Sequence, residues 1–85
     1  MSYKIIFSKA AEKEIEKIPR MYYVAVRNKI DSLTENPRPF DCKKLKGYDN
    51  FYRVRVSQYR VIYSIQDKRL IIEVIKIGHR KDIYR

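Results

Sequence analysis

The chain has very few of the residues that usually stabilise small proteins. It has one cysteine, Cys42, and one histidine, His79, among 85 residues. A single cysteine cannot form an internal disulfide, and these two residues cannot supply the four ligands of a structural zinc site. A domain of this size buries only about 60–65% of the surface of its unfolded chain, so its stability is modest. We therefore expect a stabilising partner.

Long apolar runs and glycine-rich motifs are missing as well. No window approaches the ~18 apolar residues of a membrane-spanning helix, and the first residues lead straight into a strand-like segment with no room for a signal peptide. We therefore expect a cytoplasmic protein with no membrane partner. Two glycines cannot build a glycine-rich phosphate loop, and scattered carboxylates with one histidine do not make a metal site. Neither a metal nor another cofactor is expected.

Positive charge is what the chain has in excess. Twenty Lys and Arg against ten Asp and Glu give a net charge of +10. Residues 1–42 carry eight basic and six acidic side chains, net +2, whereas residues 43–85 carry twelve and four, net +8. A soluble basic protein needs no polyanionic partner, but random scatter rarely loads one half so heavily. We expect the second half to form a surface for nucleic acid or for an acidic protein.

Residue spacing predicts one strand and two helices in the first half. Residues 3–7 are mostly β-branched or aromatic, as in a strand, and Ser8 suits a helix N-cap. Pro19 ends this helix and opens a second one from about 20 to 35, before Pro37. Helices joined by so short a link form an antiparallel hairpin. Their expected apolar stripes are Ala11, Ile15 and Ile18, and then Tyr23, Val26, Ile30 and Leu33.

From Cys42 onward the apolar period changes to two, which indicates strands. The expected strands are 43–47 (a short basic strand or strand-like loop), 51–56, 59–65 and 70–77. Gly78 ends the last of them, and 79–85 is a polar tail. The predicted fold is one α+β domain over residues 1–85, in the order β-αα-βββ(β). Its antiparallel sheet carries the helical hairpin on one face.

Arginines alternate along the predicted strand 51–56. Arg53 and Arg55 project from the same face about 6.5–7 Å apart, close to the spacing of successive phosphates along a nucleic-acid strand. Arg60 follows a tight turn and adds a third cation, and Lys44 and Lys46 precede these arginines. A solvated strand face often carries charge, which is the alternative interpretation. Arginine, however, suits bidentate phosphate contacts, so we predict that these residues bind RNA phosphates.

The tail offers groups that could take part in chemistry. His79 titrates near neutrality and could move a proton, although a lone histidine is more often structural. Tyr84 could stack on a base, although such a tyrosine more often packs. Cations with a tyrosine and a histidine suit RNA phosphodiester cleavage. In that reaction the nucleophile is the substrate's own 2′-hydroxyl, and the protein orients groups and stabilises charge.

Three sequence blocks together resemble the RelE/ParE superfamily of bacterial and archaeal toxins, on its RelE branch. The blocks are L-K-G at 45–47, Y-R-V-I-Y at 59–63 and G-H-R-x-x-I-Y at 78–84. The similarity extends over essentially the whole chain. It implies a toxin of a type II toxin–antitoxin system, a ribosome-dependent mRNA endonuclease that cuts the A-site codon and leaves a 2′,3′-cyclic phosphate. The implied partners are mRNA, ribosomal RNA and an acidic antitoxin through which the complex binds operator DNA.

The resemblance also assigns roles to residues. The family's paired basic positions fall on Arg53 and Arg55, its next arginine on Arg60, and its last arginine and tyrosine on Arg80 and Tyr84. Arg60 and Arg80 are implied to stabilise the scissile phosphate or the leaving oxygen, and Tyr84 to stack on a base or orient the 2′-hydroxyl.

One departure from the family pattern concerns the proton. The first two basic positions are commonly lysine, whereas arginine cannot readily accept a proton because its pKa exceeds about 12. Either Arg53 and Arg55 act only as charge stabilisers, or His79 transfers the proton. His79 could instead cap the strand end or stack on Tyr84.

Two other functions stay open. A ParE-like protein shares the fold but inhibits DNA gyrase, and a degenerate toxin would only bind its antitoxin. Retention of Arg60, Arg80 and Tyr84 together favours the RNase branch.

Overall fold

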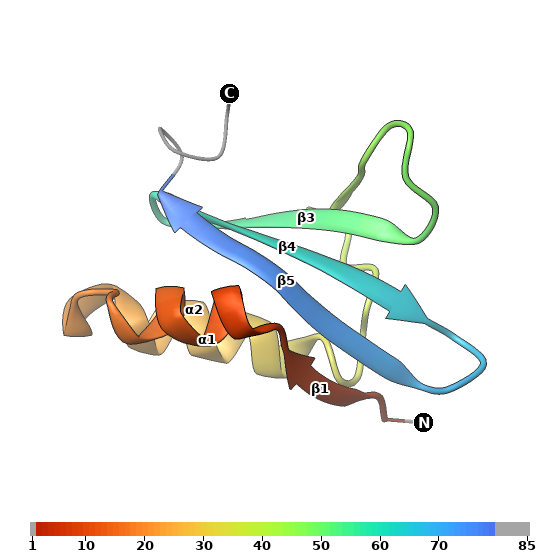
Figure 1. Ribbon diagram of the computed structural model, residues 1–85, viewed down its shortest axis with the longest axis horizontal. Helices are drawn as coiled ribbons and strands as arrows, with labels where there is room; N and C mark the ends of the chain where they lie inside the picture. Colours follow the sequence, from red (N-terminus) through yellow and green to blue (C-terminus); the bar gives the residue numbers. More distant parts are fainter. Residues whose placement is uncertain (1, 80–85) are drawn as a thin grey trace.

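The computed structural model describes residues 2–79 of the chain (Figure 1). Two of the predicted site residues, Arg80 and Tyr84, lie outside this range. The elements follow the expected order: β1 (Lys4–Phe7), α1 (Lys9–Glu16), α2 (Arg20–Ser32), β2 (Lys43–Lys44), β3 (Phe51–Val56), β4 (Tyr59–Gln66) and β5 (Ile71–His79).

Helix α1 begins where the sequence predicts. Ser8 has an extended backbone, and its Oγ accepts a hydrogen bond from the Ala11 amide at 3.0 Å, as an N-cap does. The same hydroxyl donates to the carbonyl of Ile75 at 2.7 Å, and the Ser8 amide donates to Val74 at 2.9 Å. The cap residue therefore also attaches α1 to β5.

Helix α2 ends at Ser32, earlier than the predicted 35. The amides of residues 33–35 bond to carbonyls three residues back, so the last turn tightens and leaves the α-helical pattern. The side-chain hydroxyls of Ser32 and Thr34 also donate to carbonyls three residues back. The predicted apolar stripe is correct except at its start, where Tyr22 packs against the core and Tyr23 is exposed.

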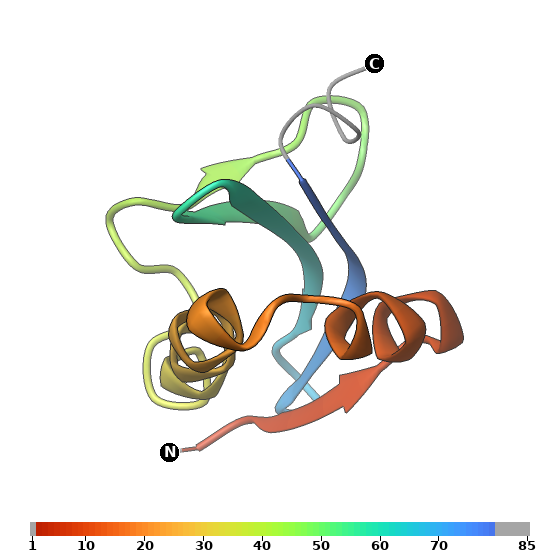
Figure 2. The same cartoon turned by 90° about the vertical axis from the view of Figure 1, so that its left-hand side faces the viewer.

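The five strands form one sheet in the order β1-β5-β4-β3-β2. The strands β2, β3, β4 and β5 pair antiparallel, but β1 lies parallel to β5, so the sheet is mixed rather than wholly antiparallel. Strand β1 is separated from β5 along the chain by the helical hairpin and three other strands, and so long a connection allows the parallel pairing that a tight turn cannot make. Both helices lie on the same side of the sheet (Figures 1 and 2).

The core lies between this side of the sheet and the two helices. Helix α2 contributes Val26 and Ile30, and its C-cap residue contributes Leu33; all three are fully buried there. The sheet contributes alternate residues of its central strands: Tyr52, Val54, Val61, Tyr63, Ile65, Ile72, Val74 and Ile77. We call this side of the sheet the helix face and the opposite side the outer face.

Strand β5 contains a β-bulge that the sequence pattern does not predict. Ile62 lies opposite Lys76, but the next residue of β4, Tyr63, lies opposite Val74, so Ile75 is the extra residue. A bulge of this kind shifts the alternation of the side chains that follow it. Val74 is buried before the bulge and Ile77 is buried after it.

Strand β5 also continues past its predicted end. Gly78 pairs with Arg60 and His79 pairs with Tyr59, the first residue of β4. The pairing of β5 with β4 therefore continues to the first residue of β4, and Gly78 does not end the strand.

Candidate nucleic-acid interface

The outer face carries the arginines that the sequence singles out. Val54 and Val61 are fully buried on the helix face. Because side chains alternate along a strand, Arg53, Arg55 and Arg60 project from the opposite side. The predicted common face of Arg53 and Arg55 is confirmed by the burial pattern of β3.

The pairing register brings these cations together. Arg55 lies directly opposite Arg60, and two residues earlier on β3 Arg53 lies opposite Lys43 of β2. Directly opposite residues have Cβ atoms about 4.5–5.5 Å apart. Lys43, Arg53, Arg55 and Arg60 therefore form a compact array, which we call the cation array. Such an array can contact two successive phosphates of one strand.

Arg60 differs from the other members of this array in its burial. It is only 4% exposed, whereas Arg55 is exposed and Arg53 is half-buried. On its other side Arg60 pairs with Gly78, which has no side chain. A buried guanidinium has few accessible rotamers, so its orientation is restricted. This is the property required of a group that stabilises charge in a transition state.

Lys43 is the member of the array that sequence reasoning missed. The basic segment was expected to contribute Lys44 and Lys46, but Lys44 lies opposite Tyr52 and therefore leaves β2 toward the helix face. Lys46 lies beyond β2, in the loop that leads to β3. Two consecutive lysines point to opposite faces, and only the register shows which one accompanies Arg53.

His79 lies apart from the cation array. It pairs with Tyr59, whose ring packs edge-on against the imidazole with the centroids 5.7 Å apart. The His79 Nε2 lies 3.0 Å from Oε1 of Gln58, and the Tyr59 ring lies 5.7 Å from that of Tyr22 on α2. Because adjacent residues alternate, His79 and Tyr59 project toward the helix face and Arg60 toward the outer face.

A hydrogen-bonded cluster holds the segment before β2. Arg38 pairs with Asp67 (Nη2 to Oδ2, 2.8 Å), and its Nε donates to the Tyr52 hydroxyl at 3.1 Å. The Tyr3 hydroxyl donates to Asp67 at 2.7 Å. The bonds from Arg38 and Tyr3 hold the pKa of the Asp67 carboxyl below its ordinary value, because they favour the charged form.

The same segment is attached at two further points. The buried Tyr63 hydroxyl donates to the carbonyl of Pro37 at 2.8 Å, and burial raises the pKa of this phenol. Lys29 of α2 pairs with Asp41 at 2.7 Å. The segment from 36 to 42 is therefore held against the helix face, which places β2 and its Lys43 beside β3.

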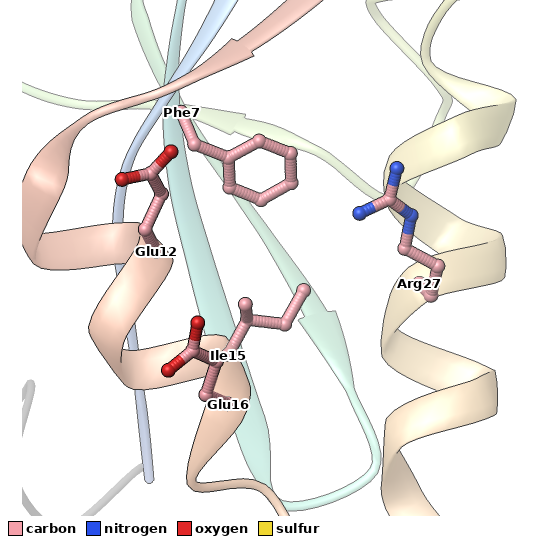
Figure 3. Close-up of a pocket in the computed structure, with 5 residues that line it drawn as sticks. All are labelled: Phe7, Glu12, Ile15, Glu16 and Arg27. Atoms are coloured by element: carbon pink, nitrogen blue, oxygen red, sulfur yellow. The ribbon is translucent and has the colours of Figure 1, made fainter.

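A separate cleft lies between the two helices (Figure 3). It has a volume of about 320 Å³ and is lined by Phe7, Glu12, Ile15, Glu16 and Arg27. The Arg27 guanidinium lies 5.3 Å from the centre of the Phe7 ring and its Nε lies 3.4 Å from Asp31. Two carboxylates in its lining make this cleft a poor site for phosphate.

Within residues 2–79, no three residues among histidine, cysteine, aspartate and glutamate come together as a metal site. Over the same range neither helix is long and apolar enough to span a membrane.

Known proteins are similar to this chain over most of its length. The family model described as "ParE toxin of type II toxin-antitoxin system, parDE" matches residues 5–84. Toxin RelE3 of Methanocaldococcus jannaschii is 31% identical over 85 residues, covering 95% of this chain and 94% of that protein. The mRNA interferase toxin RelE of Escherichia coli is 29% identical, covering 95% and 86%.

A solved structure shows the same fold. The crystal structure of the archaeal RelE–RelB complex from Pyrococcus horikoshii superposes with a TM-score of 0.83 at 32% identity, covering 94% of this chain and 97% of that one. The family model, the relatives and this structure together place the chain. It belongs to the RelE/ParE superfamily of type II toxin–antitoxin toxins, on the RelE-like branch.

Proposed function

We propose that this toxin is a ribosome-dependent mRNA endonuclease whose outer face binds the A-site codon. The observation that supports it best is the cross-strand pair of Arg55 with the buried Arg60, beside Arg53 and Lys43. The name of the Escherichia coli relative, an mRNA interferase, supports the same activity. The positive charge of residues 43–85 supports RNA, including ribosomal RNA, as a partner.

The proposed reaction uses the nucleophile of the substrate. The 2′-hydroxyl oxygen forms a bond to the adjacent phosphorus, and the bond from phosphorus to the 5′-oxygen breaks. A base takes the proton from the 2′-hydroxyl, and the 5′-oxygen gains one, so the products are a 2′,3′-cyclic phosphate and a 5′-hydroxyl. No metal is required in this scheme, because the developing negative charge on the phosphate oxygens can be stabilised by guanidinium groups.

The residues divide this work by position. Arg60, rigid and buried, stabilises the pentavalent phosphate, while Arg53, Arg55 and Lys43 hold the phosphates beside it. Arg80 is proposed to act on the same phosphate or on the leaving oxygen. Tyr84 is proposed to stack on a base or orient the 2′-hydroxyl. The roles of these last two come from the family resemblance alone.

The position of His79 bears on which group accepts the proton. His79 projects toward the helix face with Tyr59 and Gln58. We therefore propose that His79 holds the end of β5, and that Tyr84, water or ribosomal RNA takes the proton. The alternative, His79 as the base, requires its imidazole to reach the outer face.

An acidic antitoxin is the proposed protein partner. The archaeal and Escherichia coli structural relatives are RelE–RelB and RelBE complexes of a toxin with its antitoxin. The basic half of the chain would attract such an acidic partner. Through that antitoxin the complex is proposed to bind operator DNA.

The decisive experiment compares two arginine variants in translating cells. Arg60→Ala should lower A-site cleavage by ~10²–10³-fold, as the loss of one preorganised donor does. Arg69→Ala is the matched control, because Arg69 is an exposed arginine in the turn between β4 and β5. Cleavage is read by primer extension on a defined transcript, and a thermal melt of each variant checks folding. Full A-site cutting by folded Arg60→Ala would refute the assignment.

Inhibition of DNA gyrase is the second candidate, because the matching family model is described by the name of the ParE toxins. Induction of the protein separates the two functions. Codon-positioned mRNA breaks favour the endonuclease, whereas double-strand DNA damage with intact mRNA favours gyrase inhibition. Absence of growth arrest would indicate a degenerate toxin that only binds its antitoxin.

A further inference from the structure

The loop between β2 and β3, residues 45–50, rises on the same side of the sheet as the cation array. In Figure 1 it extends away from the helices above the end of β3, and Figure 2 shows it on the same side. Its base is closed by two backbone hydrogen bonds, from Leu45 to Phe51 and from Ile65 to Asn50, each 2.9 Å. Gly47 and Asn50 both have positive φ angles, 81° and 65°. The loop is therefore a defined turn that borders the outer face.

Tyr48 is the exposed aromatic residue of this loop. It is 61% exposed, and its ring lies 5.6 Å from the ring of Phe51, centroid to centroid, at an interplanar angle of 38°. Phe51 alternates in phase with Arg53 and Arg55, so its side chain lies on the outer face. The contact with Phe51 therefore places the Tyr48 ring on that face too.

Lys46 of the same loop lines one cleft with this ring. A cleft of about 540 Å³ is lined by Lys46 and Tyr48 together with Lys44 and the acidic Asp49. Along β3 the distance from Phe51 to Arg55 is about 13 Å, four residues at the rise of an extended strand. That distance corresponds to about two phosphate-to-phosphate steps of a nucleic-acid strand. A strand whose phosphate lies at Arg55 and Arg60 can thus reach the loop within a few nucleotides.

We propose that Tyr48 is a stacking platform for a nucleobase of single-stranded RNA, with Lys46 contacting the adjacent phosphate. An aromatic ring beside cations is the arrangement with which proteins bind single strands, because every base has a π-face and every nucleotide a phosphate. This inference deepens the proposed function: it adds a site for a base that lies a few nucleotides from the one that is cut.

The exposed aromatic surface, rather than the charge, favours RNA over an acidic peptide. Lysines alone would attract either partner, since both are anionic. A tyrosine that is 61% exposed and is held by contact with Phe51 presents ring surface to a planar group. The acidic antitoxin is therefore treated as an alternative outcome of the experiment.

The experiment measures binding of the full-length chain to two fluorescent RNA probes. One probe is oligoadenylate of about ten nucleotides, within the range of site sizes for such proteins. The other has the same sugar–phosphate backbone but no bases. Tyr48→Ala should weaken binding of oligoadenylate by about 5- to 100-fold and leave binding of the abasic probe unchanged. Tyr48→Phe should restore binding, because phenylalanine keeps the π-face.

Two further variants complete the comparison. Lys46→Gln should weaken binding of both probes equally. It should also reduce the steepness of the plot of log affinity against log salt concentration by about 0.7, the value for one phosphate contact. Tyr23→Ala is the matched control, because Tyr23 is an exposed tyrosine of α2, on the helix side of the sheet. It should change neither affinity.

The possible results separate the two proposals. Equal affinity of wild type and folded Tyr48→Ala for oligoadenylate would overturn the platform while leaving the Arg60 result intact. With polyglutamate as a third probe, loss of affinity of Tyr48→Ala for that peptide, with oligoadenylate binding unchanged, would overturn it in favour of an acidic protein partner. Base-dependent binding that needs Tyr48, in a chain that never cuts mRNA, would support the platform and refute the endonuclease.

Discussion

Arg55 on β3 and Arg60 on β4 lie directly opposite each other, so two guanidinium groups share one position of the sheet. Like charges in opposite positions lower the stability of a sheet. A phosphate between or beside these groups would be held by charge-assisted hydrogen bonds from both strands.

The register predicts that the two lysines of β2 differ in their effect on RNA binding. Lys43 lies opposite Arg53 on the outer face, whereas Lys44 lies opposite Tyr52. For oligoadenylate binding, Lys43→Gln should reduce the steepness of the plot of log affinity against log salt concentration by about 0.7. Lys44→Gln should reduce it by less. Titrations at several salt concentrations measure both slopes. A larger effect of Lys44→Gln would mean that RNA does not follow the outer face.

The position of His79 predicts a small effect on catalysis. His79→Gln should cut mRNA within a few fold of wild type between about pH 5 and pH 8, because the imidazole packs on Tyr59. The pH–rate profile in a reconstituted translation reaction provides the measurement. A loss of ~10²–10⁴-fold together with a flattened acid limb would instead identify His79 as the base.

The bulge of β5 is predicted to depend on Glu14. Its Oε1 accepts the Ile77 amide at 2.7 Å, and its Oε2 lies 3.5 Å from Lys76. Glu14→Ala leaves this amide without its carboxylate acceptor and should lower the free energy of unfolding by about 1–3 kcal/mol. Urea denaturation measures the change. Glu12→Ala, an exposed glutamate of the same helix, is the control, and an equal loss in both variants would show that the Ile77 contact has no special role.

The low pKa of Asp67 predicts a pH-dependent contribution to stability. The pKa of Asp67 in the folded protein lies below the ordinary 3.8. The main cause is the hydrogen bond from Arg38, and the hydrogen bond from Tyr3 adds to it. The carboxylate therefore contributes its full stability above about pH 3.8 and loses it as the pH falls through the folded value. Asp67→Asn should melt below wild type at pH 7, and the gap should close in acid. A gap that stays constant with pH would contradict this assignment.

The sequence alone determined the local features of this protein. The Ser8 cap, the strand alternation that puts Arg53 and Arg55 on one face, and the order of elements all depend on residues close together in the chain. The family resemblance likewise followed from three short sequence blocks, because such blocks can be recognised without knowledge of the fold.

The tertiary structure decided which of those residues meet. Lys43 rather than Lys44 joins Arg53, because that choice depends on the register between two strands. His79 points away from Arg60 because the bulge at Ile75 and the ladder with β4 fix the phase of β5. Just after the bulge, the Ile77 amide donates a hydrogen bond to Glu14, which lies 63 residues away in the sequence. Side-chain alternation is a local property, whereas register and bulges are set by contacts between distant segments, so no local pattern can predict them.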